Sequence, residues 1–150
     1  MPVDVPPNLD REQAANVRTA VQRLQRRQIP LHGRIAKSLI AAMLVESNIR
    51  HLDHGDRDSV GVLQQRPSQG WGPKGESVAK DIDQYLDVAV RENRKGGSAG
   101  QLAQRVQRSA FPARYDQRAG EAMRILQPFR QGRQTGGTTR QDQAPAGAGQ

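Results

Sequence analysis

The segment from residue 34 to residue 49, RIAKSLIAAMLVESNI, limits the possible folds of this chain more than any other part of the sequence. It is apolar almost all the way round when projected at a helical period, and such a helix normally lies inside a protein. One stripe along it contains Ile35, Leu39, Ala42, Met43, Glu46 and Ile49. We therefore predict a buried central helix that the rest of the chain surrounds.

Glu46 continues this line of buried side chains at the far end of the helix. Apolar neighbours and the negative end of the helix dipole both disfavour a charged carboxylate, so both raise its pKa. That direction suits a general acid, which must still hold a proton near neutral pH. Periodicity alone leaves an alternative open, in which Glu46 is half exposed and pairs with Arg50 one turn later.

The segment that follows the central helix has the composition of a binding site. A polar loop at residues 51–59 precedes a short turn with Gly61, where the backbone could closely approach a substrate. Gln64 and Gln65 offer hydrogen bonds, and Trp71 offers a flat apolar face of the kind on which sugars stack. Together these residues indicate a carbohydrate site, although for Trp71 we favour packing in the core over stacking.

Hydrophobic periodicity predicts four further helices, and no strand alternation extends beyond a few residues. They are expected at residues 11–28, 77–93, 98–109 and 114–127, with Asn8 or Asp10 and Glu76 or Ser77 as starts and Pro128 as the last stop. The predicted fold is mainly α, with about five helices and minimal β structure. We expect an extended arm at residues 1–9, one domain at 10–129 and a disordered tail at 130–150.

The net charge of +8 is carried mainly by arginines that are spread along the chain, which implies an anionic partner. Nucleic acid, an anionic membrane surface or an acidic cell-wall polymer would each satisfy the charge. The arginines are not interleaved with aromatic residues and no nucleic-acid motif occurs, so we do not expect nucleic-acid binding. No apolar run approaches the roughly 20 residues of a membrane span, so we expect no membrane insertion.

Metal binding is not expected. The chain has no cysteine, which excludes a thiolate zinc site. The loop residues His51, Asp53, His54 and Asp56 could be imagined as ligands, but exposed Asp and His are ordinary in loops. A calcium loop is rejected because Pro67 stands where its final glutamate is required. We expect no cofactor, and we expect the loop carboxylates to form a hydrogen-bonded scaffold.

Three segments resemble a known superfamily: Glu46-Ser47, the run GDRDSVGVLQQRPSQGWG at residues 55–72, and VQRSAFPARY at residues 106–115. They are similar to the lysozyme-like domain of lytic transglycosylases and goose-type lysozymes, in particular to a branch of bacterial cell-wall lytic proteins and bacteriophage tail proteins. The resemblance covers roughly residues 30–126. It implies a fold of the lysozyme-like α+β class with a very small β region.

The resemblance also implies roles for individual residues. Glu46 would be the catalytic acid, Ser47 and the turn Gly61-Val62-Leu63-Gln64 would line a sugar cleft, and the region of Tyr115 would form its far wall. Two features depart from the family. The turn has Val-Leu where Leu-Met is usual, and RSAFPARY replaces an Ala-Tyr-Asn-Ala-Gly element, which leaves open the residue that takes the place of the asparagine.

The implied substrate is the β-1,4 bond between N-acetylmuramic acid and N-acetylglucosamine in peptidoglycan. A transglycosylase needs only Glu46, whereas a hydrolytic lysozyme needs a second carboxylate, for which Asp56 and Asp58 are the candidates. We lean to the first route because only one acid is placed with assurance. The rival hypothesis is an inactive glycan-binding or structural component of a phage virion or secretion machine.

Either hypothesis places the chain at the cell wall, with glycan strands and virion or secretion-apparatus proteins as partners. The N-terminus MPVDVPPNLD has neither the basic start nor the apolar stretch of a secretory signal. We therefore expect a virion-associated protein, one delivered by other means, or one excised from a longer protein.

Overall fold

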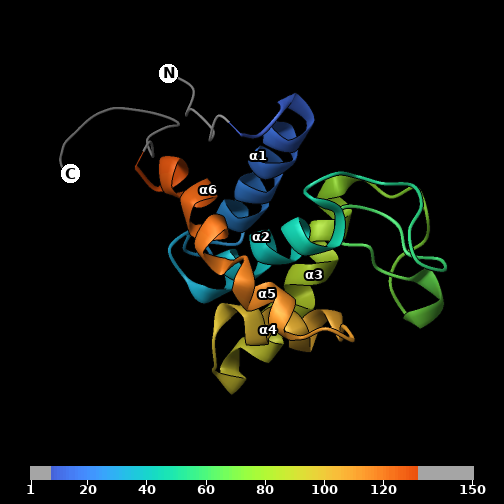
Figure 1. The fold of residues 1–150 in the computed structure, drawn as a ribbon. Helices are drawn as coiled ribbons and strands as arrows, with labels where there is room; N and C mark the ends of the chain where they lie inside the picture. The colour runs from blue at the N-terminus through green and yellow to red at the C-terminus, as the bar shows by residue number, and fades with distance from the viewer. Residues whose placement is uncertain (1–7, 132–150) are drawn as a thin grey trace.

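A computed structural model describes residues 8–131, and the predicted mainly α fold is confirmed for them. Figure 1 shows helices α1 to α6 gathered around α2. The helices are α1 (Arg11–Arg26), α2 (Arg34–Ser47), α3 (Val78–Glu92), α4 (Ala99–Gln107), α5 (Ala113–Gln117) and α6 (Ala119–Gln131), with 3₁₀ turns at Pro67–Gln69 and Asn93–Lys95. The β structure in this range is limited to two isolated bridges, Leu52 with Gly61 and Val60 with Gln65.

The central position predicted for α2 is correct. Helix α2 contacts each of the other five α-helices, and its run from Leu39 to Met43 is fully buried. The helix ends at Ser47, because Asn48 adopts a left-handed conformation with φ of 55°. Glu46 therefore lies in the last turn of a helix whose preceding turns are enclosed by the core.

The helices around α2 begin at polar caps, which satisfy backbone N–H groups that have no partner inside the helix. Asp10 and Ser98 form capping boxes with Gln13 and Gln101, and Ser77 caps α3. Helix α1 is further tied to α3 by the Arg23–Asp83 ion pair at 2.6 Å. These contacts fix α3, which begins where the long loop after α2 ends.

The end of the domain differs from the prediction in two respects. Residues 114–127, predicted as one helix, belong to α5 and α6, with a break at Arg118. Pro128 does not stop the last helix, which continues to Gln131 and includes Arg130, a residue predicted to begin the tail. Proline inside a helix removes one backbone donor and crowds the carbonyl of the preceding turn. Burial of Ile125, Leu126 and Phe129 favours the helical conformation in spite of this cost.

The loop between α2 and α3 extends to one side of the helices in Figure 1. It returns toward the core at Gly61, Val62 and Leu63, all of which are buried. No helix within residues 8–131 combines the length and apolarity needed to cross a membrane. The predictions for residues 1–7 and 132–150 lie outside the described residues.

Replacing Pro128 with alanine tests the continuation of α6. Since the helix passes through this position, Pro128→Ala restores a backbone donor, and we expect it to raise the free energy of unfolding by about 1 kcal/mol. Chemical denaturation followed by circular dichroism measures the change. Met123→Ala, at an exposed position on the same helix, serves as the control, and a loss of stability in Pro128→Ala would contradict a continuous helix.

Candidate functional site

Glu46 is held at the end of α2 by side chains from two other helices. The Tyr115 hydroxyl of α5 donates a hydrogen bond to its Oε2 atom. Gln107 Nε2, at the end of α4, contacts the same oxygen at 3.4 Å. These donors fix the direction of the carboxyl group, although residues 46, 107 and 115 are far apart in the sequence.

The second carboxyl oxygen of Glu46 is differently placed. Oε1 accepts no hydrogen bond from the residues at positions 8–131. The Glu46 side chain is not fully enclosed, since the residue is only partly buried. The carboxyl group thus has one oxygen anchored in the protein and one available to a molecule that binds beside it.

Burial raises the pKa of Glu46, and the hydrogen bonds from Tyr115 and Gln107 and the charge of Arg114 only partly oppose this effect. The pKa of Tyr115 is raised as well, by burial and by the neighbouring Glu46, so its hydroxyl stays a donor. Arg50 instead pairs with Asp10 at 2.5 Å and Glu12 at 2.8 Å. The alternative Glu46–Arg50 pair is therefore not formed.

Side-chain hydrogen bonds from neighbouring residues hold the turn at Gly61–Leu63 beside Glu46. Ser47 Oγ donates to the carbonyl oxygen of Val62 at 2.6 Å. Gln107 Nε2 donates to the carbonyl oxygen of Leu63 at 2.7 Å. Because Gln107 also contacts Glu46, the acid and the turn share one hydrogen-bond network.

The two glutamines predicted to bind substrate have partners within the protein. Gln64 Nε2 donates to the carbonyl oxygens of His54 and Gly61, both at 3.1 Å. Gln65 is buried, and its Nε2 donates to Gln107 Oε1 at 2.9 Å. Gln65 thus extends the network behind Glu46, whereas Gln64 braces the loop.

Trp71 is partly buried and packs against the hydrophobic core, which agrees with the packing role that we favoured for it.

The two aspartates considered as a second catalytic acid lie in different surroundings. The Asp56 side chain is 91% exposed. Asp58 pairs with Arg66 at 2.5 Å and accepts the backbone N–H of Ser68 at 2.8 Å. These partners, Arg66 foremost, hold the pKa of Asp58 well below its usual range. Asp58 thus acts as a loop scaffold.

Gln107 and Asp81 are site residues that the sequence analysis missed. Gln107 lies within the segment 106–115 that carried the resemblance, in the neighbourhood where the residue replacing an asparagine was left open. Asp81 lies four residues before buried Tyr85 on α3. An acid in line with an apolar stripe was the signal that identified Glu46, and the same signal was present for Asp81.

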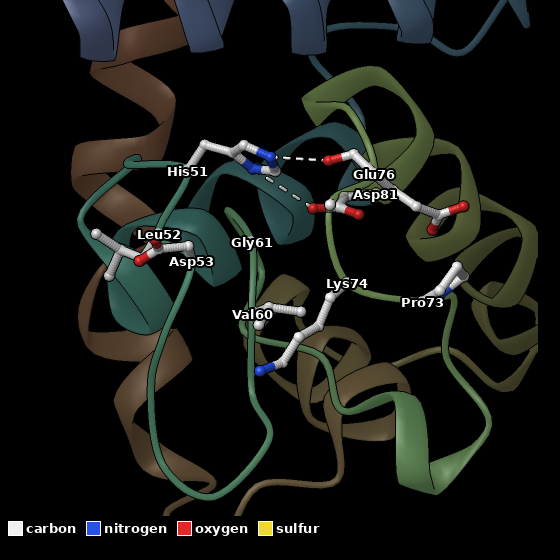
Figure 2. A pocket seen from close by; sticks show the side chains of 10 residues that line it. His51, Leu52, Asp53, Val60, Gly61, Pro73, Lys74, Glu76 and Asp81 are labelled. Carbon is white, nitrogen blue, oxygen red and sulfur yellow. Dashed lines mark hydrogen bonds and ion pairs between the residues drawn. The ribbon is translucent and has the colours of Figure 1, made fainter.

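Asp81 lies in a cavity of about 490 Å³ between the loop after α2 and the start of α3. Figure 2 shows the His51 ring directed toward Asp81 and toward the backbone of Glu76. Burial raises the pKa of Asp81 to about 6, with a smaller contribution from Glu76, against the lowering effects of His51 and the Val62 N–H. The cavity lining is His51, Leu52, Asp53, Val60, Gly61, Pro73, Lys74, Gly75, Glu76 and Asp81.

Within residues 8–131, no group of three or more His, Cys, Asp or Glu side chains is placed to hold a metal ion. When the chain is compared with models of protein families and with curated proteins, neither comparison gives a match.

Removing the Tyr115 hydroxyl is expected to raise the pKa of Glu46 further. The hydroxyl donates to the carboxyl group and so favours its charged form. Carboxyl-detected NMR titration of Tyr115→Phe should show the midpoint of Glu46 moved to higher pH than in the wild type. Tyr85→Phe, which removes a buried hydroxyl that bonds Ser38 instead, should leave it nearly unchanged. A downward shift in Tyr115→Phe would contradict the assignment.

Asp81→Asn is expected to stabilise the protein at neutral pH. Folding raises the pKa of the Asp81 carboxyl group from 3.8 to about 6. The folded state therefore becomes less stable relative to the unfolded state as the pH rises through that interval. The asparagine amide does not titrate, so the variant does not lose stability in this way. We expect a gain of about 1 to 2 kcal/mol at pH 7.5, which allows for residual solvent screening and disappears near pH 4. Urea denaturation at both pH values measures it, and an equal effect at both would refute the burial argument.

Proposed function

We propose that this chain cleaves the β-1,4 bond between N-acetylmuramic acid and N-acetylglucosamine in peptidoglycan, with Glu46 as general acid. The observation that carries the proposal is the meeting of three distant segments around one carboxyl group. Glu46-Ser47, the turn at Val62-Leu63, and the pair Gln107 and Tyr115 are joined by direct hydrogen bonds. These are the segments whose sequences resemble the lysozyme-like domain of lytic transglycosylases and goose-type lysozymes.

The state of the Glu46 carboxyl group suits its proposed first step. Burial raises the pKa of the group and so favours its protonated form, the form that a general acid needs. Since Tyr115 and Gln107 occupy Oε2, the proton is available on Oε1, to which no described residue donates a hydrogen bond. Transfer of this proton to the bridging oxygen accompanies cleavage of the C1–O4 bond, and positive charge develops at the muramyl C1.

In the second step we propose that the same carboxylate acts as a base. It removes the proton from the muramyl 6-hydroxyl, whose oxygen bonds to C1 and closes a 1,6-anhydro ring. The proton returns to Glu46, and no water is consumed. Tyr115 and Gln107 support this step as well, because donors that favour the carboxylate stabilise it after the first proton has left.

The surroundings of the aspartates favour this route over hydrolysis. A hydrolytic enzyme needs a second carboxylate that positions water on the opposite face of the sugar. Asp58 is committed to Arg66 and Ser68, and Asp56 is open to solvent without a helix to orient it. The transglycosylase route requires neither residue.

One observation favours a second candidate function, that of a glycan-binding protein without activity. Glu46 does not line the cavity of about 490 Å³ described above, and its carboxyl group is already bonded within the protein. A protein that keeps the lysozyme-like arrangement as a binding component of a virion or secretion machine would have these features. Retention on peptidoglycan without release of soluble fragments would identify this function.

Mass spectrometry of digested peptidoglycan tests the proposal. We expect the wild-type protein to release 1,6-anhydro-muropeptides. Glu46→Gln should stay folded and lose at least about a thousandfold in rate, because the amide has the same size but no acid proton to give. Asp56→Asn is the control and should keep nearly full activity.

The product spectrum also separates the alternatives. Products with reducing ends, together with loss of activity in Asp56→Asn or Asp58→Asn, would indicate hydrolysis. Unchanged activity in Glu46→Gln would overturn the role of Glu46, and release of no fragment by the wild type would leave the binding protein as the function.

A further inference from the structure

Gly61 lies against Asp81. A Cβ atom at position 61 would collide with Asp81 Oδ2, and the ring of His51 lies just beyond it. The backbone there has a φ of 88°, which side chains rarely allow. From the sequence we expected this glycine to make room for a substrate. The structure instead gives it a partner within the protein, a carboxylate from α3.

His51 connects Asp81 to the same loop. Its Nε2 atom bonds the carbonyl oxygen of Glu76 at 2.8 Å, so this nitrogen carries the hydrogen. Its Nδ1 atom faces Asp81 Oδ2 at 3.6 Å. Figure 2 shows both contacts on the ring, which therefore joins the beginning of the loop to its end just before α3.

The opposite side of this turn belongs to the Glu46 site. The carbonyl oxygens of Val62 and Leu63 accept hydrogen bonds from Ser47 and Gln107, while the Val62 N–H favours the Asp81 carboxylate. The turn is thus held between α2 and α4 on one side and α3 on the other. A displacement of the Asp81 side chain would move the turn and with it the Leu63 carbonyl group. Gln107, which bonds that carbonyl and contacts Glu46, would then move as well.

We propose that Asp81 is a positioning residue of the Glu46 site: with His51, it seats the Gly61–Leu63 turn against α3 and so fixes the wall of the site. The inference rests on the proposed cleavage of peptidoglycan. Asp81 acts through the turn and does not take part in the chemistry.

A structural role alone does not account for this arrangement. The Asp81 side chain is only 15% exposed, and the His51 ring faces it at 3.6 Å. Burying a carboxylate without a basic group at hydrogen-bond distance costs stability. Asp83, two residues later, has such a partner in Arg23 at 2.6 Å. Asp81 therefore does not serve the stability of the fold. Its contact with Gly61 instead serves to fix the position of the turn.

The test compares Asp81→Ala and Asp81→Asn with Asp83→Asn as the matched control on the same helix. Amide hydrogen exchange reports on the turn itself, since the Gly61 N–H bonds Leu52 and the Gln65 N–H bonds Val60. In Asp81→Ala we expect these two amides to exchange about tenfold faster, while core amides of α2 are unaffected. Asp81→Asn keeps an acceptor of the same size and should restore slow exchange.

Steady-state cleavage of soluble peptidoglycan fragments provides the second measurement. We expect Asp81→Ala to lower kcat by about tenfold and to change KM by less than about threefold, because the acid is displaced but the binding surface remains. Asp81→Asn should recover most of kcat. Asp83→Asn should lower the unfolding midpoint through loss of its ion pair and leave both kcat and turn exchange unchanged.

The outcomes separate this inference from the proposed function. Wild-type exchange at Gly61 and Gln65 in Asp81→Ala, or faster exchange throughout the protein, would overturn the positioning role. Faster exchange confined to the turn, without any loss of kcat, would overturn it as well. If the wild type releases no fragments, the proposed function fails, yet exchange confined to the turn still supports the role of Asp81 in seating it.

Discussion

The contacts of the turn from Gly61 to Leu63 join three helices around Glu46. Its backbone is bonded by Ser47 of α2 and Gln107 of α4, and its glycine accommodates Asp81 of α3. With only two isolated β bridges nearby, the loop has little regular structure of its own to keep its shape. Side-chain hydrogen bonds from α2 and α4, together with the close contact between Gly61 and Asp81 of α3, keep the loop against the core at this point.

Three carboxyl groups near this turn have different surroundings and therefore different acidities. Arg66 and the Ser68 backbone keep Asp58 charged. Burial dominates at Glu46 and Asp81, where hydrogen bonds and nearby charge do not fully compensate. Of these two, Glu46 has one oxygen that accepts no hydrogen bond from residues 8–131, whereas Asp81 is packed against Gly61. The same chemical group thus differs in its pKa according to its burial and its hydrogen-bond partners.

The sequence predicted the central helix and its acid because both depend on local periodicity. The stripe that ends in Glu46 predicted the burial of Leu39 and Met43 correctly. Periodicity does not specify the tertiary contacts between helix ends and loops that are far apart in the sequence. Gln107 was therefore not recognised as the partner of Glu46. The continuation of α6 through Pro128 was missed for a related reason, since tertiary packing of Phe129 outweighs the local preference of proline.

The basic charge of the chain is consistent with its acid site because the arginines divide into two groups. Some are used within the fold, as Arg23 with Asp83, Arg50 with Asp10 and Arg66 with Asp58. The excess that remains gives the net charge of +8, which attracts an anionic polymer over a long range. The charge of Arg114 lowers the pKa of Glu46, but burial has the larger effect, so a basic chain and a carboxyl group of raised pKa occur together.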